Sequence, residues 1–170
     1  PDIVFAANLD ETPKKGELPA SYAHRLAIAK AEAVAATHDG MILAGDTVVA
    51  CGRRILPKAE TADKAMTCLQ LLSGRQHRVY GGISLITADR RLFVRVVCSQ
   101  VKFRRLTGND LADALAAGDW QDKAGGYAIQ GFAARYIRHI SGSYSNIVGF
   151  SLFDVTALLD AAGYRPAILP

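Results

Sequence analysis

The chain has 170 residues, half of them hydrophobic, which is enough to bury one core of ordinary domain size. Twenty lysines and arginines against 16 aspartates and glutamates give a net charge of +4, and the basic residues are spread along the sequence. A nucleic-acid-binding surface would cluster such charge, so we expect a small anionic ligand and no nucleic-acid partner. Every apolar run is far shorter than the roughly 20 residues of a membrane-spanning helix, so no membrane partner is expected.

Three cysteines, Cys51, Cys68 and Cys98, stand far apart without the Cys-x-x-Cys spacing of a metal or redox site. An odd number leaves at least one thiol unpaired, which favours a reducing compartment, and we expect a cytoplasmic protein. Cys68 lies in a helical apolar pattern and Cys98 in a strand-like run. Both are therefore predicted to be buried packing residues.

The first half of the chain predicts alternating strands and helices. Residues 3–6 form a short β-branched run typical of a strand. A polar stretch separates them from an expected helix over residues 19–36, which has proline in its first turn and apolar residues every three or four positions. An apolar strand pattern covers residues 41–50. A second helix is expected over residues 61–73, with Gly74 at its C-terminal end.

A hairpin and a capped helix are predicted next. Residues 78–86 and 91–103 read as two strands joined by a short turn, which indicates an antiparallel pair. Thr107 and Asp110 have the spacing of a capping box, and the short helix that they open should end at Gly118.

The last part of the chain is rich in glycine between residues 119 and 149, and it contains a run of alternating character at residues 136–140. A final helix precedes Gly163. Helices and strands interleave, while the hairpin excludes a purely parallel sheet. We therefore predict an α/β domain with a mixed, twisted sheet and flanking helices.

Asp46 is a charged residue that interrupts an otherwise apolar strand pattern directly after Gly45. An ionised carboxylate inside a strand core costs several kcal/mol unless it is paired or binds a cation. The alternative is a strand that ends here, with Asp46 facing water. A glycine within a strand often marks close approach of a ligand or of another backbone segment, which favours the first interpretation.

Two carboxylates from different segments can hold a divalent cation, which prefers oxygen ligands and takes phosphate oxygens as the others. The acidic candidates near expected loops and strand ends are Asp10-Glu11, Asp46 and the pair Asp119 and Asp122. The lysines Lys30, Lys58 and Lys123 would then meet the remaining phosphate charge. These residue types are also common on protein surfaces, and Lys30 alone is equally consistent with a solvated lysine bordering the core.

Other chemistries find less support in the sequence. Ser73 lies near His77, but no G-x-S-x-G nucleophile elbow accompanies them. The glycines form neither a G-x-x-x-x-G-K phosphate loop nor a G-x-G-x-x-G fingerprint. The four histidines lack metal-ligand spacing, so no zinc site is expected.

Five segments, in order and without large gaps, match the pattern of a known family. They are Asp10-Glu11-Thr12-Pro13 with Tyr22, Leu26-Ala27 and Lys30-Ala31; Gly45-Asp46-Thr47-Val48-Val49; Leu72-Ser73-Gly74-Arg75 through Val79-Tyr80-x-Gly82; Trp120-x-x-Lys123-Ala124-Gly125-x-Tyr127-x-Ile129-Gln130-Gly131; and Gly142-Ser143-Tyr144-x-Asn146-x-Val148-Gly149. Together they resemble the Maf family of nucleoside triphosphate pyrophosphatases, over about residues 2–166.

The resemblance implies a fold related to the inosine-triphosphate pyrophosphatases, with a long twisted sheet and a cleft between two lobes. It also implies a reaction in which water attacks the α-phosphate of a nucleoside triphosphate with the help of Mg²⁺ or Mn²⁺. Asp46 matches the proton acceptor, which could instead ligate the metal, and Glu11 matches a metal-binding acid. Lys30, Lys58 and Lys123 match basic positions near the phosphates.

Two residues place the chain in one branch of the family. Thr47 after the acid and Gln130 before Gly131 resemble the branch that acts on dTTP and UTP, whereas another branch acts on 7-methyl-GTP. A glutamine amide offers both a donor and an acceptor, which suits the imide edge of thymine or uracil. The resemblance therefore implies dTTP and UTP as substrates.

The chain departs from the family pattern in two places. Pro57-Lys58-Ala59 stands where the family has G-K-P, so we expect a different loop around a retained lysine. Residues 1–170 are expected to form one Maf-like domain, with the family's opening strand and S-x-S-P-R-R loop placed before Pro1. The alternative function is a catalytically weak, nucleotide-binding regulator of cell division, acting in septum formation. A homodimer is expected by analogy alone.

Overall fold

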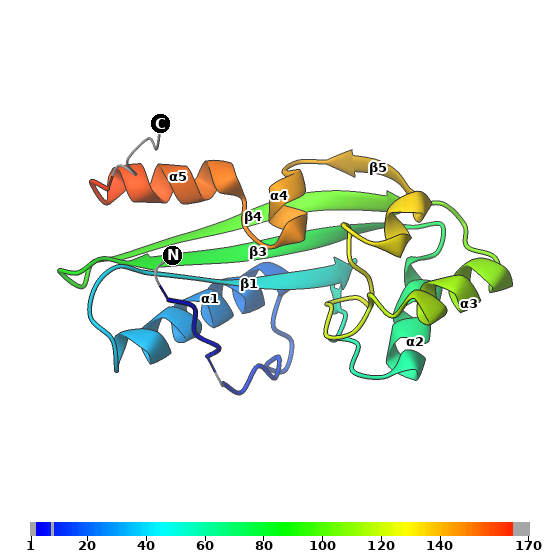
Figure 1. Ribbon diagram of the computed structural model, residues 1–170, viewed down its shortest axis with the longest axis horizontal. Coiled ribbons are helices and arrows are strands. Elements are labelled where there is room, and N and C mark those ends of the chain that lie inside the picture. The colour runs from blue at the N-terminus through cyan, green and yellow to red at the C-terminus, as the bar shows by residue number, and fades with distance from the viewer. Residues whose placement is uncertain (1–2, 8, 165–170) are drawn as a thin grey trace.

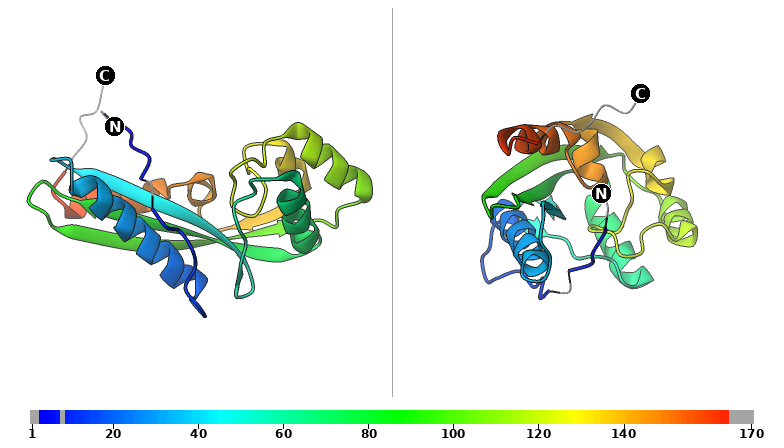
Figure 2. Two further views of the ribbon diagram at one scale, coloured as in Figure 1. Left: turned by 90° about the horizontal axis from the view of Figure 1, so that it is seen from below. Right: turned by 60° about the vertical axis from the view of Figure 1, so that its left-hand side comes forward.

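The computed structural model describes residues 3–7 and 9–164, and its centre is an antiparallel sheet with the strand order β2-β1-β3-β4-β5 (Figure 1). The strands are β1 (Ile42–Cys51), β2 (Arg54–Ile55), β3 (Gln76–Ile86), β4 (Leu92–Phe103) and β5 (Ile137–Ser141). The long strands β1, β3 and β4 twist along their length (Figure 2). The predicted α/β class is confirmed, and all pairs among the described strands are antiparallel.

Helices cover both faces of this sheet (Figures 1 and 2). The long helix α1 (Pro19–Ala35) lies on one face. The opposite face carries α4 (Tyr144–Val148) and α5 (Leu152–Ala161) over β3 and β4. At one end of the sheet α2 (Ala62–Leu72) packs against α3 (Gly108–Ala117), and the 3-10 helix η1 (Phe132–Tyr136) lies beside α3.

The largest core lies at this end, on the sheet face opposite α1. Its fully buried members come from α2, β3, β4 and η1 and include Leu69, Leu72, Val79, Val101, Phe103 and Tyr136. A smaller cluster around Tyr22, Ala23, Leu26 and Val48 holds α1 to the other face. Apolar burial on both faces explains why β1 and β3 read as nearly continuous apolar runs in the sequence.

Two adjacent glycines of β3 let helices approach the backbone beside Asp46. Asp46 pairs with Gly82, so both lie on the same face of the sheet. A Cβ atom at Gly82 would collide with the carbonyl oxygen of Ala23 in α1, and one at Gly81 with the amide oxygen of Asn146 in α4. The first contact places α1 directly over the face to which Asp46 belongs.

Most local predictions are confirmed. The helices begin and end within a few residues of the expected positions, and the hairpin of β3 and β4 is present. Thr107 Oγ1 accepts from the backbone N–H of Asp110 at 3.2 Å, and the Asp110 carboxylate accepts from the backbone N–H of Thr107 at 2.7 Å. Gly118 ends α3 in the left-handed region at φ 73°.

Two local predictions are wrong. Residues 3–6 are irregular, with Ile3 and Val4 largely exposed, because no strand among the described residues pairs with them. Cys98 was expected to be buried but is exposed on β4, whereas Cys68 is buried as predicted. Helices long and apolar enough to cross a membrane are absent from residues 3–7 and 9–164.

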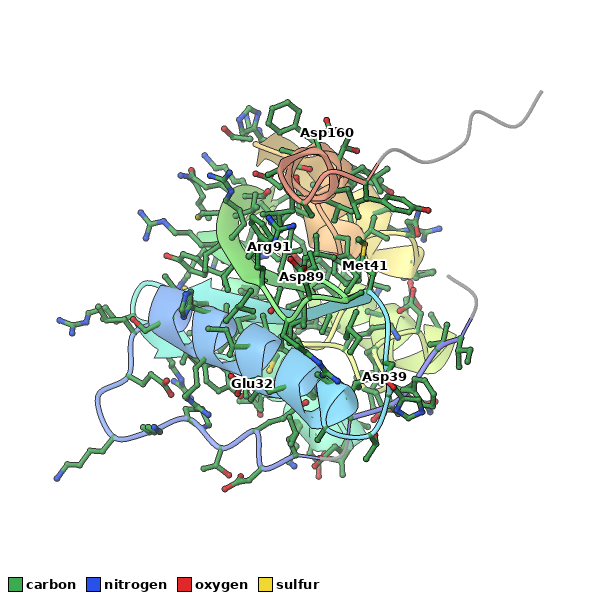
Figure 3. The ribbon with its side chains drawn as sticks, turned by 90° about the vertical axis from the view of Figure 1, so that its left-hand side faces the viewer. Glu32, Asp39, Met41, Asp89, Arg91 and Asp160 are labelled. Atoms are coloured by element: carbon green, nitrogen blue, oxygen red, sulfur yellow. The ribbon has the colours of Figure 1, made fainter. Side chains whose placement is uncertain are left out.

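The end of the sheet away from α2 and α3 carries charged turns, where Asp39, Asp89 and Arg91 are labelled (Figure 3). Arg91 pairs with Asp89 at 2.8 Å, and Arg90 pairs with Asp39 at 3.0 Å. Arg90 also donates to the carbonyl oxygen of Ala35 at the end of α1, at 2.6 Å. Arg90 and Arg91 therefore pair with acidic residues of nearby turns, and Arg90 also binds the C-terminal end of α1.

Candidate active site

A cleft bends around the edge of β1 at Asp46 and Thr47. It consists of two adjoining cavities of about 370 and 400 Å³, and both are lined by Asp46, Thr47, Lys58 and Ala124. The larger cavity opens on Glu11 and Tyr22, on the α1 side. The smaller cavity, on the other side, is lined by Lys123, Gln130 and apolar side chains.

Four of the predicted site residues form a chain of alternating charges on the α1 side. The ammonium of Lys30 lies 2.5 Å from Asp46 Oδ1 and 2.7 Å from Glu11 Oε1. The ammonium of Lys58 lies 2.5 Å from Glu11 Oε2. The side chain of Asp46 is only 6% exposed and that of Lys30 17%. The alternatives in which Asp46 faces water and Lys30 is an unpaired surface lysine are therefore excluded.

The loop that carries Glu11 is tied to α1. The hydroxyl of Tyr22 donates to the carbonyl oxygen of Glu11. Arg25 donates to the carbonyl oxygen of Thr12 at 3.2 Å and forms a bidentate pair with Glu17, with both distances 2.8 Å. Because Lys30 comes from the same helix, α1 positions both this lysine and the loop of Glu11 beside Asp46.

The pKa values in this cluster reflect burial and opposite charge. Burial raises the pKa of Asp46 above its usual value, although Lys30 partly offsets the effect. Burial acts in the same direction on Glu11, but Lys30 and Lys58 outweigh it, so the pKa of Glu11 is lowered. Burial tends to lower the pKa of Lys30, yet its two carboxylate partners raise it above the usual value. Opposite charges thus outweigh burial at Glu11 and Lys30 and offset only part of it at Asp46.

Lys58 and Lys123 are brought together by a short backbone ladder. The backbone N–H of Ala59 donates to the carbonyl oxygen of Lys123 at 3.1 Å, and that of Gly125 donates to Pro57 at 3.0 Å. A proline at position 59 would lack the first donor, which gives the alanine in this chain a structural role. The departure from G-K-P therefore leaves Lys58 lining both cavities.

The far wall of the smaller cavity is a loop packed onto the sheet. Gly125 lies against Val49 of β1 with φ at 73°, where a side chain would be strained and would crowd Val49. The hydroxyl of Tyr127 lies 2.7 Å from Nε2 of His77, which is 1% exposed. Thr47 and Gln130 line the same cavity, so the two residues predicted to read the base do meet at one site.

Sequence reasoning missed some contacts around the site and misread others. His77 was given no chemical role, and its burial and its Tyr127 contact depend on a residue 50 positions away. The carboxylate of Asp119 accepts from the backbone N–H of Phe132 and lines neither cavity, whereas Asp122 lines the smaller one. Gly45 is needed because the ring of Phe150 and the carbonyl oxygen of Gly82 crowd it, and no ligand is required to explain it.

The donor set for a metal consists of two carboxylates. Glu11 and Asp46 both pair with the ammonium of Lys30; Asp46 lines both cavities, whereas Glu11 lines only the larger one. Among residues 3–7 and 9–164, no group of three His, Cys, Asp or Glu side chains is placed to hold a metal ion. Mg²⁺ is commonly bound by one or two carboxylates together with water and substrate phosphates, so this pair fits such a cation.

Comparison with known proteins agrees with this geometry. A family described as "Maf-like protein" matches residues 2–162. A dTTP/UTP pyrophosphatase of Paramagnetospirillum magneticum is 60% identical over 98% of this chain and 88% of its own length. Proteins of the same name from Rhodospirillum rubrum and Rhodopseudomonas palustris (strain HaA2) are 58% and 49% identical, over 98% and 96% of this chain and 80% and 83% of their own lengths. The chain therefore belongs to the family of Maf-like proteins.

Proposed function

We propose that this protein hydrolyses dTTP and UTP between the α- and β-phosphates, producing the nucleoside monophosphate and pyrophosphate. The observation that carries the proposal is the alternating cluster of Asp46, Lys30, Glu11 and Lys58, of which Asp46 and Lys58 line both cavities. The names of the relatives support the same reaction. They also favour an enzyme over a non-catalytic regulator of cell division.

The reaction needs a triphosphate held in line with a water molecule. Lys58 and Lys123 border the smaller cavity and would meet the phosphate charge. Asp46 would orient the attacking water and accept its proton at a carboxylate oxygen. Burial raises the pKa of this carboxyl, which makes it a better base than an exposed aspartate. As the water oxygen bonds to the α-phosphorus, the bond to the bridging oxygen breaks and pyrophosphate leaves with that oxygen.

We propose Mg²⁺ or Mn²⁺ as cofactor, held by Glu11 and Asp46 together with phosphate oxygens of the substrate. When bound, the cation supplies positive charge that offsets the charge of the triphosphate. Lys30 pairs with both carboxylates, so it keeps them on the same side of the cleft.

The smaller cavity would take the base. Its wall is apolar where Val79, Tyr127, Ile129 and Ile147 line it, and Gln130 supplies a side-chain amide. An amide can donate to a carbonyl oxygen of thymine or uracil and accept from the imide N–H. This pattern suits the 4-keto pyrimidines better than cytosine, whose ring nitrogen carries no proton.

We propose the cytoplasm as the compartment. Cys51, Cys68 and Cys98 are free thiols, which agrees with a reducing environment. A homodimer stays a prediction from the family resemblance.

The test is pyrophosphate release by the purified protein with dTTP, UTP, dCTP, GTP and 7-methyl-GTP, each with Mg²⁺, Mn²⁺ or EDTA. We expect release from dTTP and UTP that requires a divalent cation. A higher kcat/KM for 7-methyl-GTP than for dTTP and UTP would contradict the substrate assignment. Failure of every nucleotide to release pyrophosphate would contradict the reaction itself.

A further inference from the structure

Gly131 lies directly after Gln130, and the backbone conformation at this position does not require a glycine. Its φ of −157° and ψ of −161° are extended values that any residue adopts. A Cβ atom at this position would instead collide with Oδ2 of Asp119. The absence of a side chain at Gly131 therefore makes room for a carboxylate that comes from a different part of the loop.

The same Oδ2 atom accepts a hydrogen bond from the backbone N–H of Phe132. This N–H opens the 3-10 helix η1, where a backbone donor would otherwise lack an intrahelical partner. One carboxylate oxygen thus packs against Gly131 and binds the next residue. Asp119 in this way holds two consecutive backbone positions after Gln130.

Asp119 is itself held firmly. It follows Gly118, which ends α3 in the left-handed region, and it precedes the buried Trp120. The indole N–H of Trp120 donates to the carbonyl oxygen of Leu115 in α3 at 2.9 Å. The clamp on residues 131 and 132 is therefore anchored in a helix.

Gln130 lies between this clamp and a buried residue. Ile129 is 7% exposed and belongs to the main core, whereas Gln130 is exposed and lines the smaller cavity. With Ile129 anchored on one side and Gly131 on the other, the backbone fixes the point from which the side chain of Gln130 starts and the direction of its Cα–Cβ bond.

We propose that Asp119 is a positioning residue for base selectivity, acting through the backbone of Gly131 and Phe132 on Gln130. This inference rests on the proposed function, since it concerns how that site tells thymine and uracil from other bases. Asp119 lines neither cavity, so its effect on the base is indirect. Its loss should weaken recognition of the base more than the chemical step.

Asp119→Ala and Asp119→Asn test this role through kcat and KM for dTTP, UTP and dCTP. We expect the alanine variant to lose about tenfold in kcat/KM for dTTP, mainly through KM, the size expected when a displaced Gln130 loses its hydrogen bond to the base. The preference for dTTP over dCTP should fall by a similar factor. The asparagine variant keeps a carbonyl oxygen as acceptor and should retain most of the preference.

Gly131→Ala disturbs the same contact from the other side, because its Cβ atom would collide with the carboxylate of Asp119. Alone, it should displace the carboxylate and reduce the preference as Asp119→Ala does. Combined with Asp119→Ala it should cost little more, because the colliding carboxylate is then absent and residues in contact are not additive. Fully additive effects would show that the two residues act separately and would overturn the inference.

Asp154→Ala is the matched control, since this carboxylate accepts from Ser151 Oγ at 2.5 Å at the start of α5 and lines neither cavity. It should lower Tm without changing the preference. An Asp119→Ala variant with a lowered Tm and an unchanged preference would overturn the inference.

Binding of dTMP, measured by calorimetry on the same variants, separates this inference from the reaction. A wild-type protein that releases no pyrophosphate, yet binds dTMP with the expected dependence on Asp119, would overturn the proposed reaction and support the inference. Unchanged dTMP affinity in Asp119→Ala would count against the inference, whether or not the protein is active.

Discussion

The two sides of the β1 edge bury titratable groups in opposite ways. On the α1 side, Asp46 and Lys30 lie against each other as an oppositely charged pair, with 2.5 Å between the ammonium and Oδ1. On the opposite side, His77 and Tyr127 are buried against each other without a charged partner. Burial lowers the pKa of His77 to about 4 and raises the pKa of Tyr127, so both are neutral at pH 7.

This difference separates two tasks within one cleft. The charged side can bind phosphates and move a proton, because its groups keep their charges when water is excluded. The opposite side presents apolar walls and the amide of Gln130, which suit a base, while Lys123, which also lines that cavity, would meet the phosphates. Substitutions on the charged side should therefore change turnover, and substitutions of the neutral groups on the opposite side should change stability and selectivity.

The largest effect is expected for Asp46→Asn. This change keeps the size of the side chain but removes the base, so kcat for dTTP should fall by about 10³-fold or more. Pyrophosphate release and Tm are measured together, and Tm should stay close to that of the wild type. The exposed carboxylate of Asp63, changed to asparagine, serves as the control and should leave kcat unaltered. Near-normal turnover by a folded Asp46→Asn protein would refute the catalytic assignment.

A smaller effect is expected for His77→Gln, and it should appear in the pH dependence of stability. The unfolded chain binds a proton at His77 below about pH 6.5, whereas the folded protein does so only near pH 4. Above pH 6.5 both states are neutral, and stability falls as the pH drops towards 4. Between pH 7 and pH 4, protonation of His77 in the unfolded chain should lower the free energy of unfolding of the wild type by about 3 kcal/mol. The variant has no histidine at this position and should not show this loss.

Urea unfolding at pH 7, 6, 5 and 4 measures this difference. The exposed His139, changed to glutamine, provides the control, and its curve should follow the wild type. If wild type and His77→Gln lost stability in parallel over this range, the neutral burial of His77 would be wrong.

The smallest effect is expected for Gln130→Ala. Loss of the amide should lower kcat/KM for dTTP about tenfold through KM, with kcat nearly unchanged, since one hydrogen-bonding group to the base is removed. Gln121, which is exposed and lines neither cavity, is the matched glutamine control. A fall in kcat with unchanged KM would show that the two sides of the cleft do not divide the tasks as described.

Local features of the fold were predictable because their causes lie within a few residues of chain. The capping box of Thr107 and Asp110 and the left-handed Gly118 come from neighbouring residues, and α1 follows from its apolar spacing. The strand predicted at residues 3–6 fails for the opposite reason. A strand depends on a partner, and no described strand lies beside these residues.

The sequence predicted which residues belong to the candidate site, but it did not predict which of them contact each other. The resemblance to the Maf family named Glu11, Lys30, Asp46 and Lys58, and the ion pairs among them agree with that choice. Lys30 and Asp46 meet across 16 residues, because Gly82 lets α1 approach the sheet. Such a contact depends on the register of β1 with β3, which the sequence pattern of either strand leaves undetermined.

By itself the sequence determined the α/β class, the helices and the hairpin, and through its motifs the family and the residues of the cleft. Hydrophobic period and capping are local, so they can be read from neighbouring residues. Only the tertiary structure decided that Asp46 is buried with a lysine partner, that His77 is buried as a neutral group, and that the carboxylate of Asp119 occupies the space beside Gly131. These properties depend on which surfaces pack together, because burial and distance between remote segments set both the charge states and the available space.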